Sequence, residues 1–63
     1  MTEQADRTAV QHMMRRLDGF ARGLGLDEAT TRQIVEKVAA EMVDRPDEER
    51  MMEARKRMLL ASA

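Results

Sequence analysis

The residues best suited to chemistry in this sequence are one histidine and seven methionines. His12 lies beside Met13 and Met14, and an imidazole next to thioether sulfurs is a soft ligand set of the kind that binds Cu(I). The spacing favours another role, because Met13 and Met14 continue an apolar helical stripe, and Met51 and Met58 are seven residues apart, as in a core or interface seam. We therefore predict no metal site and no cofactor, and we interpret His12 as a solvated surface residue.

Nucleophilic catalysis needs an activated hydroxyl, thiol or amine beside a base. The chain contains no cysteine, one serine at position 62 and one histidine at position 12. The acidic residues are spread along the sequence at positions expected on exposed helix faces, rather than paired across an apolar pocket. We therefore predict no catalytic residues, and we expect a protein that is not an enzyme.

The length of the chain limits its core. A domain of 63 residues buries only about 60% of the surface that its unfolded chain exposes. Domains of this size seldom gain more than about 3–5 kcal/mol from their own core, and without cysteine there is no disulfide to add to it. We expect a single helical domain over residues 1–63 that associates with itself or with a protein partner.

Charged residues are abundant but balanced. Eleven lysines and arginines and twelve acidic residues leave a net charge of −1 and a pI near 5.8, whereas nucleic-acid-binding domains usually carry a basic excess. No apolar run approaches the ~20 residues needed to cross a bilayer, and the start MTEQADR lacks the basic-then-apolar plan of a secretory signal. We therefore expect a cytoplasmic protein without a membrane partner or a small-molecule substrate, for which nucleic acid is the disfavoured partner.

Apolar residues recur every three or four positions and nowhere alternate with period two, which predicts an all-α fold. Asp27 is a favoured N-cap residue, and Pro46 suits the first turn of a helix. Gly19 leaves open whether the first helix is continuous or broken. The expected helices cover about 3–23, 28–44 and 46–60. We predict a small three-helix bundle, or a helical hairpin with a projecting third helix, in an oligomeric protein.

Four glutamates are each followed by an arginine four positions later, which is the favourable orientation for an ion pair along a helix. Because such pairs lie on solvated helix surfaces, they favour helices in all three segments. The pairs are Glu3–Arg7, Glu28–Arg32, Glu41–Arg45 and Glu53–Arg57.

The third segment combines apolar side chains with a central arginine. Arg55 is three or four residues from each of four large apolar residues, so its guanidinium lies in the middle of an apolar helical stripe. Either the side chain extends over this stripe to reach water, or it meets a carboxylate of a partner. The predicted partner-binding residues are Met51, Met52, Arg55, Met58 and Leu59.

Residues 21–35, ARGLGLDEATTRQIV, resemble the helix-turn-helix of sigma-factor region 4 and of lactose-repressor-class regulators. Ala21 matches the small position of the first helix, Leu24-Gly25-Leu26 the turn, and Ile34 the anchor of the second helix. The likeness covers about a quarter of the chain, and Leu-Gly-Leu-Asp before an amphipathic helix is also an ordinary turn. The residues that the resemblance implies for base contacts are Glu28, Ala29, Arg32 and Gln33.

Two features of this segment depart from the pattern. Thr31 occupies a position where the family usually buries an aliphatic side chain, and Gly23 weakens the first helix. Residues 26–44 also hold five acidic and only two basic residues, so the helix that would face DNA lies in the most acidic part of the chain. Lys and Arg supply most non-specific affinity for phosphates, and an acidic helix would be repelled.

The sequence therefore predicts a non-enzymatic adaptor, inhibitor or accessory subunit. It would bind itself or a larger protein through methionine- and leucine-rich faces of the first and third helices, in the manner of a helix in a groove. The alternative is a helix-turn-helix transcriptional regulator that uses residues 20–38.

Overall fold

Three helices form the protein between residues 2 and 63, which is the part of the chain that the computed structural model describes, with side chains from residue 7 onward. Helix α1 spans Thr2–Leu24, α2 spans Glu28–Glu41 and α3 spans Asp47–Ser62. No strand occurs among these residues. The predicted all-α fold with three helices is confirmed.

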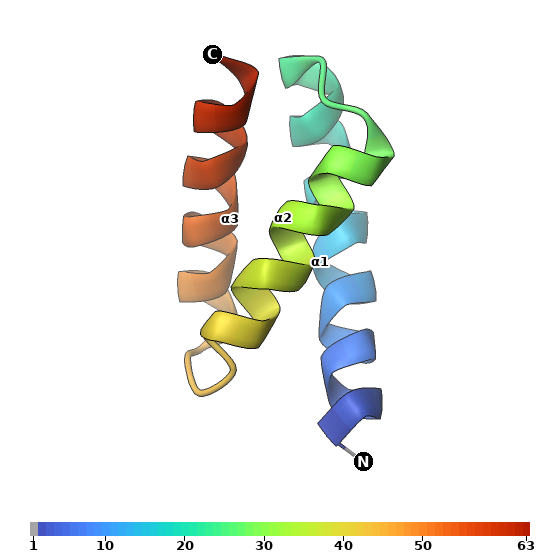
Figure 1. The fold of residues 1–63 in the computed structure, drawn as a ribbon, viewed down its shortest axis with the longest axis vertical. Coiled ribbons are helices and arrows are strands. Elements are labelled where there is room, and N and C mark those ends of the chain that lie inside the picture. Colours follow the sequence, from blue (N-terminus) through green and yellow to red (C-terminus); the bar gives the residue numbers. More distant parts are fainter. Residues whose placement is uncertain (1) are drawn as a thin grey trace.

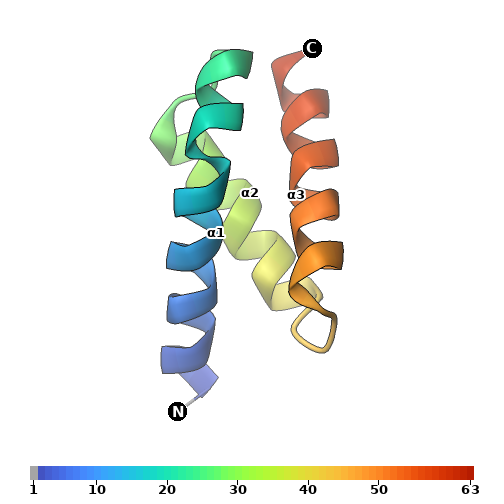
Figure 2. The same ribbon diagram turned by 180° about the vertical axis from the view of Figure 1, so that it is seen from behind.

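Helices α1 and α3 lie side by side and run in the same direction, and α2 crosses obliquely over one side of this pair (Figure 1). The view from behind shows the same order, with α2 on the far side (Figure 2). Each helix contacts the other two, and the molecule measures 34 × 17 × 15 Å. Because α1 and α2 cover α3 only from one side, the opposite side of α3 faces outward along its whole length.

One core serves all three helices. Its long side chains include three methionines, whose unbranched and flexible form suits the irregular space between helices that cross obliquely. Leucine, valine and alanine fill the rest of the core, and each helix contributes one apolar face to it. The buried apolar residues are Val10, Met13, Leu17 and Ala21 of α1, Val35, Val38 and Ala39 of α2, and Met51, Ala54 and Met58 of α3.

The corner between α1 and α2 has a defined hydrogen-bond pattern. Gly25 has a φ of 77°, a left-handed conformation that glycine adopts without steric cost. Its N–H donates to the carbonyl of Arg22 at 3.1 Å, and the N–H of Leu26 donates to the carbonyl of Ala21 at 3.0 Å. This pair of bonds is the Schellman motif, which satisfies the carbonyls at a helix end. It explains why α1 ends at Leu24.

Asp27 begins α2 as its N-cap, as predicted. Its Oδ1 accepts a hydrogen bond of 2.8 Å from the N–H of Thr30. Hydrogen bonding by the Thr30 side chain, and then by this N–H, lowers the pKa of the carboxyl below its ordinary value. The Thr31 hydroxyl donates to the Asp27 carbonyl at 2.9 Å, so Thr31 is buried with its polar atom satisfied. A threonine can therefore occupy this core position.

The connection between α2 and α3 differs from the expected boundaries. Helix α2 ends at Glu41 instead of continuing to Asp44, because Met42 leaves the helical region with φ −117° and ψ 39°. The N–H of Arg45 then donates to the Met42 carbonyl at 3.0 Å and closes a turn. Proline disfavours helical geometry in the residue before it, so the chain must leave α2 ahead of Pro46. Pro46 itself is the N-cap of α3, which therefore starts one residue later than expected and ends two residues later.

Helix α1 is continuous through Gly19, the residue at which the sequence left a break open. A Cβ added at Gly19 would meet no atom within 4 Å. The glycine therefore weakens the helix by its conformational freedom without serving a close contact.

We expect Gly19→Ala to stabilise the protein by about 0.5–1 kcal/mol and to raise the melting temperature by about 2–8 °C. Gly25→Ala is the matched control. It should lower the melting temperature, because alanine is strained at a φ of 77°. Thermal unfolding followed by circular dichroism measures both effects. A shift of the same sign in the two variants would contradict this account of α1.

Candidate protein-binding surface

The side of α3 that points away from α1 and α2 carries three large exposed apolar side chains. Met52 is 65% exposed, Leu59 51% and Leu60 69%. They lie seven and eight residues apart, so they follow one side of the helix. We call this surface, with the exposed charged residues between them, the outer face of α3. It consists of Glu48, Glu49, Met52, Arg55, Lys56, Leu59 and Leu60.

The five predicted partner-binding residues do not share one surface. Met51 and Met58 are buried in the core with exposures of 2% and 0%, so their inclusion in a partner surface is wrong for the folded chain. Met52, Arg55 and Leu59 are exposed. The physical reason is that α3 is apolar on two sides, and the side that carries Met51 and Met58 packs against α1 and α2.

Arg55 lies at the edge of the outer face that is nearest to α1. It lines a shallow groove of about 260 Å³ together with Arg16 of α1 and with Glu48, Met51 and Met52 of α3. Two guanidinium groups and one carboxylate therefore surround a small apolar floor. Arg55 forms no ion pair with any other described residue.

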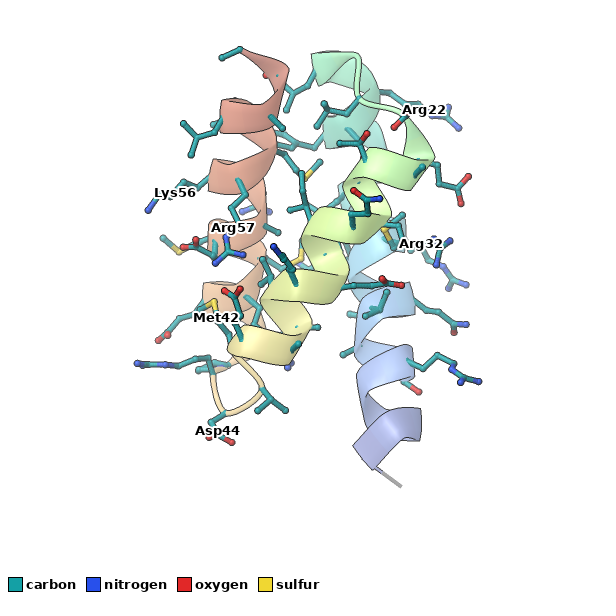
Figure 3. The ribbon with its side chains drawn as sticks, in the orientation of Figure 1. Arg22, Arg32, Met42, Asp44, Lys56 and Arg57 are labelled. Carbon is teal, nitrogen blue, oxygen red and sulfur yellow. The ribbon has the colours of Figure 1, made fainter. Side chains whose placement is uncertain are left out.

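The charges of the outer face are divided along the helix. Glu48 and Glu49 belong to its first turns, and Arg55 and Lys56 to its second half. Glu49 pairs with Arg45 at 3.5 Å, whereas within the described chain Glu48 and Lys56 have no ion-pair partner. Figure 3 shows the Lys56 side chain extending away from the other two helices. These charges are therefore available to another molecule.

The charged residues on the inner sides of α3 are paired within the chain. Arg57 binds Glu41 of α2 at 2.6 Å and Glu53 at 2.8 Å, and its guanidinium lies toward α2 (Figure 3). The hydrogen bond to Arg57 lowers the pKa of Glu41, and the same contacts raise the pKa of Arg57. These contacts fix the orientation of α3 against α2.

Asp47, the first residue of α3, makes the corresponding contacts with α1. Its carboxylate lies 3.9 Å from His12 and 4.0 Å from Arg16, and it binds Arg50 of α3 at 3.0 Å. All of these groups except Arg50 are substantially exposed, so each contact contributes little alone. Together they hold the start of α3 beside α1.

The residues implied by the helix-turn-helix resemblance lie on the first turns of α2. Glu28, Ala29, Arg32 and Gln33 are all exposed. Arg32 is already paired with Glu28, with 3.1 Å between Nη2 and Oε2. A phosphate or base would have to compete with this carboxylate for the guanidinium.

The remaining chemistry-bearing residues are separated. Met13 is in the core and His12 is on the surface of α1. Among the described residues, no group of three or more histidine, aspartate or glutamate side chains could hold a metal ion. None of the helices described combines the length and the apolar character that crossing a membrane requires.

Comparison with protein-family models, with curated proteins and with solved structures finds no match to this chain. The sequence reasoning missed Leu60, which the spacing of eight residues from Met52 could have identified. It also missed the pairing of Arg57 with Glu41, for which the sequence carries no local signal.

We expect part of the folding stability to depend on the two carboxyls with lowered pKa values, Asp27 and Glu41. Their ordinary values are 3.8 and 4.5. Because both pKa values are lower in the folded state, their contribution is present above these ordinary values and is lost as the pH falls through the folded values. The Asp27→Asn/Glu41→Gln variant keeps acceptor oxygens but cannot titrate. Its urea-unfolding midpoint should change less than that of the unmodified protein between pH 7 and pH 3. Equal changes would contradict the assignment.

Proposed function

We propose that this protein is a non-enzymatic interaction module that binds another polypeptide through the outer face of α3. The observation that carries the proposal is the exposure of Met52, Leu59 and Leu60 on a helix whose opposite side is already buried in the core. Large apolar residues clustered on one face, with charged residues around them, are typical of protein-binding surfaces.

The size of this apolar surface indicates what a partner must provide. Burying a leucine or methionine fully contributes about 1.5–3 kcal/mol, so covering the exposed parts of three such side chains contributes on the order of 3 kcal/mol. Association costs at least about 4 kcal/mol in lost translational and rotational freedom. The partner must therefore add apolar surface of its own and charges that match those of α3.

The proposal that the protein is not an enzyme is supported by the separation of its chemical groups. His12 lies beside Asp47 at the start of α3, whereas Ser62 ends the same helix and donates to the Leu59 carbonyl at 2.9 Å. Fifteen residues of helix separate the two ends of α3, which is about 22 Å. The only histidine of the sequence therefore lies far from the only serine hydroxyl.

Duplex binding through α2 is the second candidate function. It is supported by the exposure of Glu28, Ala29, Arg32 and Gln33 on the same turns that follow Gly25 and the Asp27 cap. It is opposed by the acidic character of residues 26–44 and by the pairing of Arg32 with Glu28. We therefore rank it below protein binding.

We expect Met52→Glu or Leu59→Glu to abolish association while leaving helicity largely intact. A buried carboxylate without a partner strongly disfavours an apolar contact, but both side chains are exposed in the isolated chain. Ala29→Glu makes a similar change on an exposed part of α2 and is the matched control. Circular dichroism measures helicity. Sedimentation, together with identification by mass spectrometry of proteins that co-purify from the native host, measures association. Unchanged complex formation in both α3 variants would rule out this surface.

The duplex-binding candidate makes a separate prediction. Arg32→Ala and Gln33→Ala should weaken binding to a specific duplex, and the affinity should fall steeply as salt rises. Lys37→Ala removes the same charge as Arg32→Ala from another side of α2 and should have less effect. Fluorescence anisotropy with labelled duplexes measures these affinities. Absence of any retention on DNA at low salt would end this candidate.

A further inference from the structure

We infer that the partner of this surface is a second copy of the chain, with the two α3 helices packed antiparallel around a two-fold axis near Met52. The inference rests on the proposed function, and it names the partner and its orientation. It is carried by the distribution of apolar and charged residues along the outer face of α3.

A symmetric contact supplies the additional apolar area that one outer face of α3 lacks. In a two-fold dimer each residue of the contact is used twice, so both copies bring Met52, Leu59 and Leu60 to the same interface. The apolar surface that is covered is thereby doubled, without requiring a partner of other chemistry.

The charges determine the direction of pairing. Glu48 and Glu49 precede Met52 by four and three residues, and Arg55 and Lys56 follow it by three and four. An antiparallel arrangement therefore sets the acidic half of each helix against the basic half of the other. A parallel arrangement would bring like charges together, which is unfavourable.

The same charges select the register. When the two copies of Met52 meet, Glu48 of each copy faces Lys56 of the other, and Glu49 faces Arg55. A shift that placed Met52 against Leu59 of the other copy would instead bring the basic residues of the two helices together. The chosen register also brings Leu59 and Leu60 to the α2–α3 turn of the second copy, opposite the exposed Arg45 and Asp44 and beside the half-exposed Val43.

The residues that this arrangement uses are free to take part. Glu48, Arg55 and Lys56 have no ion-pair partner among the described residues, so their pairing across the dimer breaks no contact within the chain. Glu49 is paired with Arg45 at 3.5 Å within the chain. Arg57 forms an ion pair with Glu41 of α2 on the inner side of α3, so it takes no part in the proposed dimer contact.

The test is a charge exchange between Glu48 and Lys56, followed by sedimentation of the full chain at about 1–500 μM. The unmodified protein should dimerise. Glu48→Lys alone and Lys56→Glu alone should each weaken the dimer by about ten-fold or more, because each change creates two like-charge contacts across the two-fold axis.

An equimolar mixture of the two variants should form heterodimers, since both contacts then join opposite charges. The double variant Glu48→Lys/Lys56→Glu should dimerise like the unmodified protein for the same reason. Glu36→Lys, a charge reversal on the exposed side of α2, is the matched control and should leave the dimer unchanged. Circular dichroism establishes that each variant remains helical.

The outcomes separate this inference from the proposed function. A chain that stays monomeric throughout this range overturns the dimer, and the proposed function then stands or falls on whether Met52→Glu abolishes binding to a different protein. A dimer that resists both single reversals, or whose variants do not recover on mixing, overturns the antiparallel arrangement. Recovery on mixing would establish both the partner and its direction.

Discussion

Burial of one side of each helix in a single shared core is the constraint on which the rest of this structure depends. The chain is too short for a second apolar layer, so every helix must present one face to the same small space. Helix α2 crosses one side of the pair formed by α1 and α3, and all three helices contribute residues to the core. The faces that remain outside this arrangement are left for a partner, and among the residues whose side chains are described, only those of α3 place several large apolar side chains along such a face.

Much of this fold could be predicted from the sequence, because the core of α1 follows a single apolar stripe. Val10, Met13, Leu17 and Ala21 are all buried as their spacing indicates. The helix starts and ends were also readable where they depend on local chemistry, as at Gly25 and Asp27. The end of α2 could not be predicted from local chemistry, because the turn at Met42 depends on how the chain reaches α3.

The candidate surface was harder to predict, because α3 carries two apolar stripes with the same spacing. Met51 and Met58 are seven residues apart, and so are Met52 and Leu59, so helical periodicity describes two apolar stripes equally well. Which stripe is buried depends on the direction from which α2 approaches. The ion pairs also depend on how the helices are arranged, and not on sequence spacing alone. Glu28–Arg32 and Glu53–Arg57 form as predicted, but Glu41 turns to Arg57 across the helix boundary and Arg45 pairs with Glu49. Glu3 lies outside the residues whose side chains are described.

The two short connections also have a kinetic consequence. Only residues 25–27 and 42–46 separate the helices, so most native contacts join segments that are close in the chain. Proteins of such low contact order fold within microseconds to milliseconds, far faster than two chains at micromolar concentration ordinarily meet. In the proposed dimer each copy therefore completes its own fold first, and assembly is a later, bimolecular event whose extent depends on the protein concentration.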